Sequence, residues 1–305
     1  MIGIIVLNYI NWNDTLRCVN SILNSEVKVK YKIYIVDNAS PNTCKSEIEN
    51  LFKDEKIEII YNDKNNGYSS GNNIGIIKAI EQGCKQILIS NNDVIFKKDS
   101  IYNMYSFLEK NSYVGIVGPK IYTENGEIQA INMGIKMSLK GKYLNIMNKT
   151  IFKFLSKKFM NKFCISTENL EGNFEVFAVS GCCFMISEKC VKDITPFDEN
   201  TFLYEEENII GCCMEEKGYK TVYNTESEIV HLHGKSTDNI KAFSYICFVE
   251  SELYYCKYYL KSSKIKIIPL YLIRSSKYIL EMIRNEDYRQ NFKIYLKKTL
   301  KMLLK

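Results

Sequence analysis

The sequence has little proline and histidine, and its cysteines lack the spacing of a metal site. Four prolines, two histidines and eleven cysteines occur in 305 residues, and no two cysteines form a Cys-x-x-Cys pair. The cysteine doublets at 182–183 and 212–213 lie in apolar runs, where cysteine behaves as a small hydrophobic residue. We therefore expect free thiols in a reducing cytosol, not a disulfide framework.

Long apolar runs are also missing. The apolar run at 2–7 is too short, and too poor in flanking charge, for a signal peptide. Within the basic C-terminal region the longest uncharged stretch, 267–273, has seven residues, whereas a membrane-spanning helix needs about 20. We therefore expect a cytoplasmic protein that does not span a membrane.

Charge is distributed unevenly along the chain. Residues 257–305 contain 13 Lys or Arg and three acids, a net charge of +10, which leaves −4 for residues 1–256. A basic tail of this kind favours phosphate groups, on lipid or on nucleic acid. No known nucleic-acid-reading motif accompanies the charge, so we expect an anionic membrane surface and no nucleic acid as the partner.

The basic tail also has apolar and aromatic residues at helical spacing. This pattern predicts an amphipathic helix that lies at the inner face of the cytoplasmic membrane. The alternative is that these helices pack on the rest of the chain or on a second subunit, so a homodimer is left open. The residues concerned are Ile267, Leu270, Tyr271, Tyr278 and Met282.

The first third of the chain alternates strand and helix patterns. This alternation predicts an α/β fold with a mostly parallel sheet and helices on both of its faces. Ligands of such sheets bind beyond the carboxyl ends of the strands. The expected strands are 2–7, 31–36, 57–61, 86–90 and 113–117, and the expected helices are 13–23, 46–52, 74–80 and 99–108.

The later part of the chain is less regular. We expect an irregular excursion or a short helical insertion over 121–173, and helices from residue 241 onward. These patterns predict a main domain at 1–240 and a basic helical extension at 241–305. Further expected elements are a strand at 174–187, a helix at 205–217, and short strands at 221–223 and 228–230.

Two carboxylates follow predicted strands directly. Asp37 comes after the run 31–36, where a carboxylate can accept hydrogen bonds from a base or a ribose. Asp93 ends Ser-Asn-Asn-Asp, and a carboxylate flanked by amides suits a hard cation such as Mg²⁺ or Mn²⁺. Because Asp and Asn also favour turns, an ordinary turn is the alternative at both places.

Three further segments contain polar side chains typical of a site. The glycine- and amide-rich loop 65–75 precedes a helix whose first N–H groups can bind anions, although a long turn would look the same. The acids at 205–207 open another helix, where the helix dipole favours glutamate without any function. Both histidines of the chain, His231 and His233, lie in one short segment.

Taken in order, these five segments resemble the family 2 glycosyltransferases with a GT-A fold. The likeness covers residues 2 to about 240 and is closest to bacterial rhamnosyltransferase-like enzymes of cell-surface polysaccharide assembly. It implies that Asn8 and Asp37 are nucleoside-contacting positions. It further implies that Asn65 and Gly67 are the amide–glycine pair that lines the nucleotide pocket.

The resemblance also implies a metal site. Asp93 matches the last acid of the family's Asp-x-Asp motif, whose first acid is Asn91 here. His231 matches the histidine of an H-x-x-G-x-S pattern, completed by Gly234 and Ser236, that can reach the metal or the diphosphate. The expected cofactor is Mn²⁺ or Mg²⁺.

Glu206 and Glu207 match the family's Glu-Asp pair, whose second member resembles the general base. The family acid two residues after this pair is replaced by Ile209. The resemblance implies inverting transfer of a sugar such as rhamnose from a UDP- or dTDP-linked donor to the hydroxyl of a lipid-linked glycan acceptor. The alternatives are a nucleotidyltransferase, disfavoured because no basic glycine-rich loop follows the run at 2–7, and a non-catalytic sugar-nucleotide- or nucleic-acid-binding protein.

Overall fold

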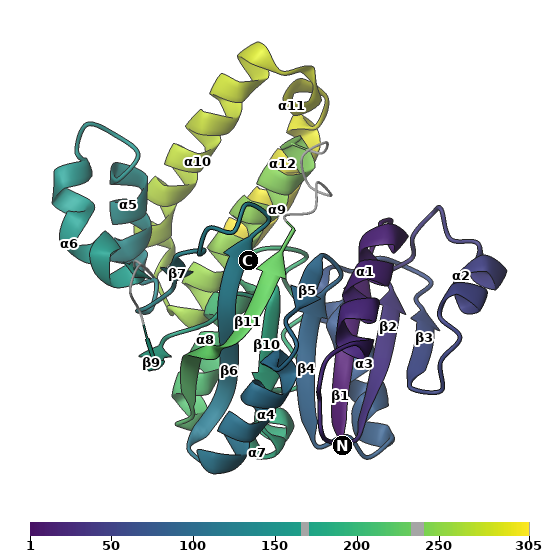
Figure 1. The fold of residues 1–305 in the computed structure, drawn as a ribbon. Helices are drawn as coiled ribbons and strands as arrows, with labels where there is room; N and C mark the ends of the chain where they lie inside the picture. Colours follow the sequence, from purple (N-terminus) through teal and green to yellow (C-terminus); the bar gives the residue numbers. More distant parts are fainter. Residues whose placement is uncertain (166–170, 233–240, 305) are drawn as a thin grey trace.

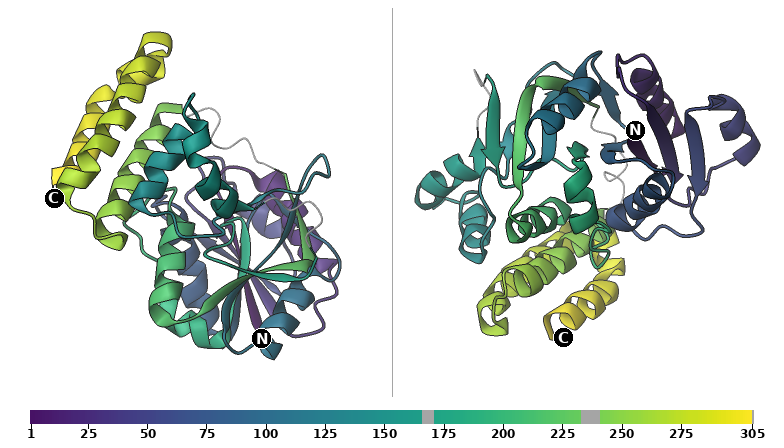
Figure 2. Two further views of the ribbon diagram at one scale, coloured as in Figure 1. Left: turned by 90° about the vertical axis from the view of Figure 1, so that its left-hand side faces the viewer. Right: turned by 90° about the horizontal axis from the view of Figure 1, so that it is seen from below.

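The structure, a computed structural model, describes residues 1–165, 171–232 and 241–304. Within these residues nine strands form one sheet in the order β3-β2-β1-β4-β10-β6-β11-β5, with β9 paired to β11 (Figure 1). Helices cover both faces of the sheet, and a group of C-terminal helices packs beside it (Figures 1 and 2). The predicted α/β fold class is therefore confirmed.

One half of the sheet is wholly parallel. Its strands are β1 (Ile2–Asn8), β2 (Tyr31–Asp37), β3 (Ile57–Tyr61) and β4 (Gln86–Asn91). Alternate side chains of these apolar strands enter two separate cores, because successive residues of a strand point to opposite faces. Helices α1 (Trp12–Leu23) and α2 (Lys45–Leu51) cover one core, and α3 (Tyr68–Glu81) covers the other.

The other half of the sheet is mixed. Strand β10 (Cys183–Ile186) lies antiparallel between β4 and β6 (Val114–Thr123). Strand β11 (Lys220–His231) runs parallel to β6, and antiparallel to β9 (Asn173–Val176) and β5 (Val94–Phe96). Helices α4 (Ser100–Lys110), α7 (Glu188–Ile194) and α8 (Glu206–Lys217) complete this half.

Two strand predictions differ from the structure here. The single strand expected over 174–187 is divided into β9 and β10, which pair with different strands because the chain turns between them. The two short strands expected at 221–223 and 228–230 are parts of one strand, β11, with a register irregularity between Asn224 and Glu228.

The segment expected to be an irregular excursion or a short helical insertion contains a helical hairpin, so the second alternative is correct. Helices α5 (Leu139–Met147) and α6 (Lys153–Phe163) pack against each other, and β7 (Ile131–Asn132) pairs with β8 (Cys164–Ile165) at their base. We call residues 139–163 the α5–α6 hairpin. It projects from the sheet next to the C-terminal helices (Figure 1).

The C-terminal helices form a third core with α8. They are α9 (Lys241–Tyr254), the π-helical turn η2 (Tyr255–Tyr259), α10 (Lys264–Arg284), α11 (Glu286–Gln290) and α12 (Phe292–Leu304). Among the described residues no helix is long and apolar enough to cross a membrane. The division at residue 240 stays a prediction, because it falls in a segment outside the described residues.

The prediction that the apolar residues 267–282 of the tail face the membrane is wrong. Ile267, Leu270, Tyr271 and Tyr278 are all at least 93% buried in the third core, and Met282 packs against it. These side chains contact neighbouring helices, so the packing alternative is correct for them. Helical spacing identified an apolar face of α10, but spacing does not say whether a lipid or a protein covers that face.

Candidate active site

The Asp37 carboxylate is held in place by its neighbours. In the paired strands β1 and β2, Asn8 lies opposite Asp37, and its Nδ2 donates a 2.9 Å hydrogen bond to Asp37 Oδ1. The hydroxyls of Ser40 and Thr43 also donate to this carboxylate. Asn8 in turn accepts a 2.8 Å hydrogen bond from the hydroxyl of Thr15. The predicted nucleoside-contacting positions thus lie together at the carboxyl end of two parallel strands.

The loop before α3 packs against the segment before α8. Asn65 Oδ1 accepts hydrogen bonds from Asn38 Nδ2 at 2.8 Å and from the Gly67 amide at 3.0 Å. Gly67 has φ 98°, and a side chain there would overlap the backbone of Phe202. The next amide, of Tyr68, donates to the Phe202 carbonyl at 3.0 Å. Glycine is therefore required at this close contact, and Asn38 and Phe202 are partners that motif reading missed.

Asp93 and His231 lie side by side. Asp93 occupies the turn between β4 and β5, and the pairing of β5 with β11 places His231 opposite Val94. His231 Nε2 is 3.3 Å from Asp93 Oδ1, and both side chains are largely buried. The predicted metal-binding pair is therefore brought together by strand register. His233, Gly234 and Ser236 lie outside the described residues.

Asn91 and Asn92 connect this turn to its surroundings. The Asn91 amide donates a 2.8 Å hydrogen bond to the Cys182 carbonyl. Asn92 Nδ2 donates to the Asn8 side chain at 3.2 Å and to the Asn11 carbonyl at 3.0 Å. Asn92, which the motif comparison did not single out, thereby ties the Asp93 turn to the Asp37 network.

The Asp93–His231 pair fits a metal ion that completes its coordination with a ligand. The described residues contain no group of three or more His, Cys, Asp or Glu side chains suited to a metal. One carboxylate and one imidazole are a small donor set, typical of Mg²⁺ or Mn²⁺ sites where phosphate oxygens supply further ligands. The donor set therefore suits a cation bound together with a diphosphate.

Of the two acids at the start of α8, Glu206 is buried and Glu207 is half-buried. Tyr204 and Glu205 have left-handed backbones, with φ 75° and 68°, and this turn directs the first residues of α8 inward. The Gly181 amide donates a 3.1 Å hydrogen bond to Glu207 Oε1. Burial raises the pKa of Glu207, although hydrogen bonds from backbone amides lower it in part. The site thus contains a carboxylate that is oriented but poorly solvated.

One carboxylate oxygen of Glu206 differs from the bound Oε1 of Glu207. The Oε1 atom of Glu206 is buried without a hydrogen-bond partner among the described residues. Burial, and then the charge of Glu207, raise the pKa of Glu206 to about 8. When one of these two adjacent acids is ionised, ionisation of the other becomes less favourable.

The turn at Ser180–Cys182 joins the Asp93 and Glu207 regions. Its Gly181 amide binds Glu207, its Cys182 carbonyl accepts from Asn91, and Tyr68 Oη donates to the Gly181 carbonyl at 2.6 Å. Burial, together with the charges of Asp93 and Glu207, raises the pKa of the Cys182 thiol to about 12, although a hydrogen bond with Ser180 lowers it in part. This one turn therefore contacts Glu207 directly and the Asp93 turn through Asn91.

A family model supplies the deciding comparison. The model described as "Glycosyl transferase family 2" matches residues 2–195, more than half of the chain. The chain belongs to glycosyl transferase family 2. The match ends before α8, so the roles of Glu206 and Glu207 in this family 2 protein stay predictions.

Known proteins similar to this family 2 chain include other glycosyltransferases. The low-salt glycan biosynthesis hexosyltransferase Agl10 of Haloferax volcanii is 26% identical over 68% of this chain and 59% of its own length. The dTDP-rhamnosyl transferase RfbF of Shigella flexneri is 24% identical over 36% of each chain. The chain thus spans less than two thirds of each relative's length.

A solved structure supports the GT-A fold of this family 2 protein. GalNAc-T7, solved with UDP, GalNAc and Mn²⁺, superposes with a TM-score of 0.57 at 14% sequence identity. The superposition covers 76% of this chain and 43% of GalNAc-T7. At this identity the likeness establishes the fold alone.

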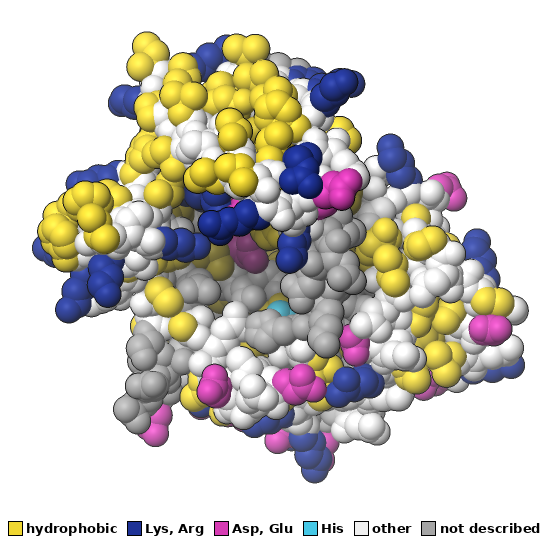
Figure 3. All heavy atoms as spheres, turned by 90° about the horizontal axis from the view of Figure 1, so that it is seen from above, with side chains coloured by type: hydrophobic (Ala, Val, Ile, Leu, Met, Phe, Trp, Pro, Cys, Tyr) yellow, Lys and Arg dark blue, Asp and Glu magenta, His cyan; other side chains and the backbone are white. Residues whose placement is uncertain are grey.

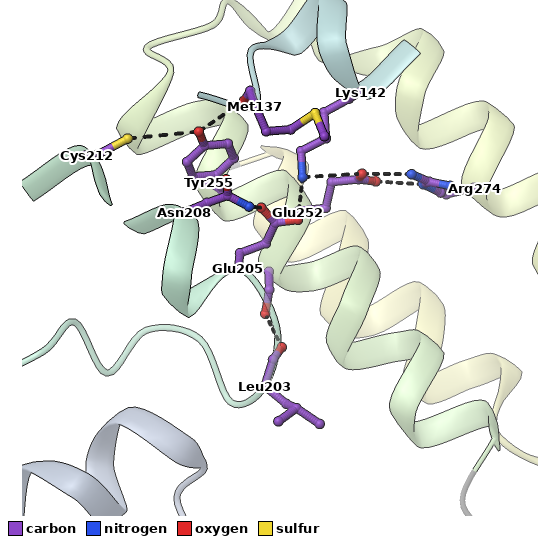
Figure 4. Close-up of polar contacts among 10 residues, drawn as sticks. Met137, Lys142, Leu203, Glu205, Asn208, Cys212, Glu252, Tyr255 and Arg274 are labelled. Atoms are coloured by element: carbon purple, nitrogen blue, oxygen red, sulfur yellow. Dashed lines mark hydrogen bonds and ion pairs between the residues drawn. The ribbon is translucent and has the colours of Figure 1, made fainter. Parts of the chain in front are cut away.

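A buried ionic network supports the start of α8 (Figure 4). Lys142 of α5 donates a hydrogen bond to Glu205 Oε1, and Asn208 Nδ2 donates to Glu205 Oε2 at 3.0 Å. Lys142 also lies 3.9 Å from Glu252 of α9, which receives two hydrogen bonds from Arg274 of α10. Three elements remote in sequence therefore hold the residue that precedes the acid pair.

Proposed function

We propose that this protein is an inverting, metal-dependent glycosyltransferase. It would transfer a sugar from a nucleotide diphosphate, UDP- or dTDP-linked, to an acceptor hydroxyl. The observation that carries the proposal is the placing of two unlike acidic groups around the Ser180–Cys182 turn. Asp93 lies beside His231 in the turn whose Asn91 binds the Cys182 carbonyl, and Glu207 is bound to the Gly181 amide.

A site with a metal-binding pair and a separate carboxylate base suits direct displacement at the anomeric carbon. A divalent metal held by Asp93 and His231 would offset the charge on the departing diphosphate. Glu207, oriented by Gly181, would accept the proton of the acceptor hydroxyl while the acceptor oxygen bonds to the anomeric carbon and the bond to the diphosphate breaks. A single displacement inverts the configuration at that carbon. Glu206 is the alternative to Glu207 as the base.

The named relatives suggest the kind of sugar and pathway. A hexosyltransferase of glycan biosynthesis and a dTDP-rhamnosyl transferase are both similar to this chain. We extend this to transfer of a hexose, such as rhamnose, during assembly of a bacterial cell-surface polysaccharide. We further propose a lipid-linked acceptor at the inner face of the cytoplasmic membrane, supported by the net charge of +10 over residues 257–305.

The direct test is a screen of nucleotide sugars with Mn²⁺ or Mg²⁺, measuring released nucleoside diphosphate. Asp93→Ala should abolish metal-stimulated release and weaken binding of the sugar donor. Asp99→Ala is the matched control, because Asp99 is an exposed carboxylate six residues away without a side-chain cap hydrogen bond. Release that is unchanged in Asp93→Ala would refute the metal role. Sugar-nucleotide binding without any release would instead favour a non-catalytic binding protein.

A further inference from the structure

The tip of the α5–α6 hairpin exposes large apolar side chains. Ile151 is 84% exposed, Phe154 66%, Leu155 54% and Phe152 50%. Isolated exposed apolar residues are ordinary on soluble proteins, but four within five positions form a patch, and such patches mark interaction sites. The described residues of the chain do not cover this tip, so we expect it to contact a partner.

The hairpin is well packed below this tip. Gly141 of α5 lies so close to the Phe159 ring of α6 that a side chain there would overlap it. The Ser156 hydroxyl donates to Asn148 Oδ1 at 3.1 Å, and Tyr143 Oη donates to the Lys266 carbonyl of α10 at 2.9 Å. The apolar tip is thus presented by a structured element anchored to α10.

The charge of the hairpin has one sign. Residues 128–167 contain eight lysines and no Asp or Glu. Lys149, Lys153, Lys157 and Lys158 surround the apolar tip, and none of them forms an ion pair with another described residue. Apolar side chains among unpaired lysines match the interface of an anionic bilayer, where the chains enter the acyl boundary and the lysines meet phosphate.

Helix α10 adds a second apolar surface beside the hairpin. Its buried face packs in the third core, whereas the opposite face is exposed to solvent. Figure 3 shows hydrophobic side chains gathered over the hairpin and over the C-terminal helices, with Lys and Arg around them. The exposed residues of α10 are Ile265 (81%), Ile268 (40%), Leu272 (59%), Ile273 (39%), Ile279 (51%), Leu280 (63%) and Ile283 (72%).

We propose that the tip of the α5–α6 hairpin, residues 149–158, inserts into an anionic lipid bilayer together with the exposed face of α10. A second copy of this chain is a poorer occupant, because it would bring a like-charged lysine cluster against this one. The inference deepens the proposed membrane placement and rests on it. It adds the hairpin tip, which lies outside the basic tail 257–305, to the face of α10, which lies within it.

The test is sedimentation of the full-length protein with phosphatidylcholine vesicles, with and without phosphatidylglycerol. Phe154→Ser/Leu155→Ser should weaken binding to anionic vesicles by about tenfold or more, because two apolar side chains no longer enter the bilayer. Lys157→Gln/Lys158→Gln should weaken it by about tenfold at low salt and less at high salt. Tyr113→Ser and Lys53→Gln/Lys110→Gln, at exposed positions elsewhere, are the matched controls and should bind like the wild type.

Two measurements distinguish a failure of this inference from a failure of the proposed function on which it rests. Thermal unfolding and nucleoside diphosphate release without lipid should be unchanged in the hairpin variants, since these side chains are exposed at the tip of the hairpin. Wild-type binding of the hairpin variants to anionic vesicles would overturn the inference while leaving the proposed transfer reaction intact. Equal wild-type binding to neutral vesicles, or a wild-type dimer that the hairpin variants convert to monomer, would also overturn it.

Discussion

Asp37 and Glu206 are buried and Glu207 is half-buried, but the surroundings of Asp37 differ from those of the two glutamates. The Asp37 carboxylate receives hydrogen bonds from the side chains of Asn8, Ser40 and Thr43. Glu207 receives one from the Gly181 amide, and Glu206 has a buried oxygen without a partner among the described residues. Hydrogen bonds stabilise an ionised carboxylate, whereas burial without them favours the protonated form. The first environment suits a positioning role, and the second suits a group that accepts a proton.

The two regions also differ in what supports them. The Asp37 network is built from β1, β2 and the short loops that follow them, all within the first 43 residues. The start of α8 is held by Lys142 of α5, while Lys142 and Glu252 join it to α9 and α10 (Figure 4). The proposed base therefore depends on the hairpin and the C-terminal helices, although neither belongs to the parallel half of the sheet.

The largest expected effect follows from removing the proposed base. Glu207→Gln keeps the size of the side chain but cannot accept a proton as a carboxylate does, so turnover should fall by about 10² to 10⁴. Binding of the sugar donor should stay nearly unchanged. The check is steady-state release of nucleoside diphosphate, with Glu206→Gln measured in parallel. A large loss in Glu206→Gln alone would make Glu206 the base.

The ionic network gives the next largest effect. Lys142→Met leaves Glu205 buried without its cation, which typically lowers the free energy of unfolding by about 3–5 kcal/mol. Urea denaturation measures this change, and Lys140→Met, at an exposed lysine of the same helix, is the control. Lys142→Met/Glu205→Gln should recover part of the loss, because it removes the unpaired charge. If the double variant is no more stable than Lys142→Met, the pair does not carry the effect.

The sequence predicts the parallel half of the fold and the strand-tip residues well. Continuous apolar runs such as 31–36 are local signals, and the polar residue after each run lies at the same edge of the sheet. The contacts of Lys142 and Gly181 could not be predicted in this way. Lys142 meets Glu205 across 63 positions and Gly181 meets Glu207 across 26, so each contact depends on tertiary packing.

The face of α10 illustrates the same limit. Helical spacing correctly indicated that Leu270 and Tyr278 share an apolar side, but the structure buries that side in protein. The exposed residues Ile265 and Ile283 lie on the other side of the helix. A helix that is apolar on two sides has no single amphipathic face, so periodicity alone cannot assign its partners.

A smaller loss of stability is expected where α3 contacts the segment 197–199. Asn73 of α3 donates to the Phe197 carbonyl and the Glu199 carboxylate, and it accepts from the Phe197 amide. Asn73→Ala should lower the free energy of unfolding by about 2 kcal/mol, because buried backbone groups lose their partners. Asn72→Ala is the matched control, since Asn72 is equally buried and, among the described residues, its side chain donates only to Tyr68 of the same helix. Equal losses in calorimetry would mean that the cross-region contact contributes nothing.

The comparison also predicts how activity depends on pH. The proposed base must be ionised, and burial raises the pKa of Glu207 and, to about 8, that of Glu206. The rate should therefore still rise with pH above the ordinary range of a glutamate, by about tenfold per unit while the base is mostly protonated. A kcat/KM profile measured with saturating metal checks this. A rate that is already constant from about pH 5 would show that the base ionises as an ordinary glutamate.

Stability should change with pH in the opposite direction. A carboxyl whose folded pKa is raised binds more protons in the folded than in the unfolded state, so the free energy of unfolding falls as pH rises. For Glu206 this stability is fully present below the unfolded value of about 4.3 and is lost as pH rises through about 8. Glu206→Gln should flatten the decline, because glutamine does not ionise, and should leave the variant more stable than the wild type above that window. Urea denaturation across this range measures both curves, and parallel curves would contradict the buried, poorly partnered environment inferred for Glu206.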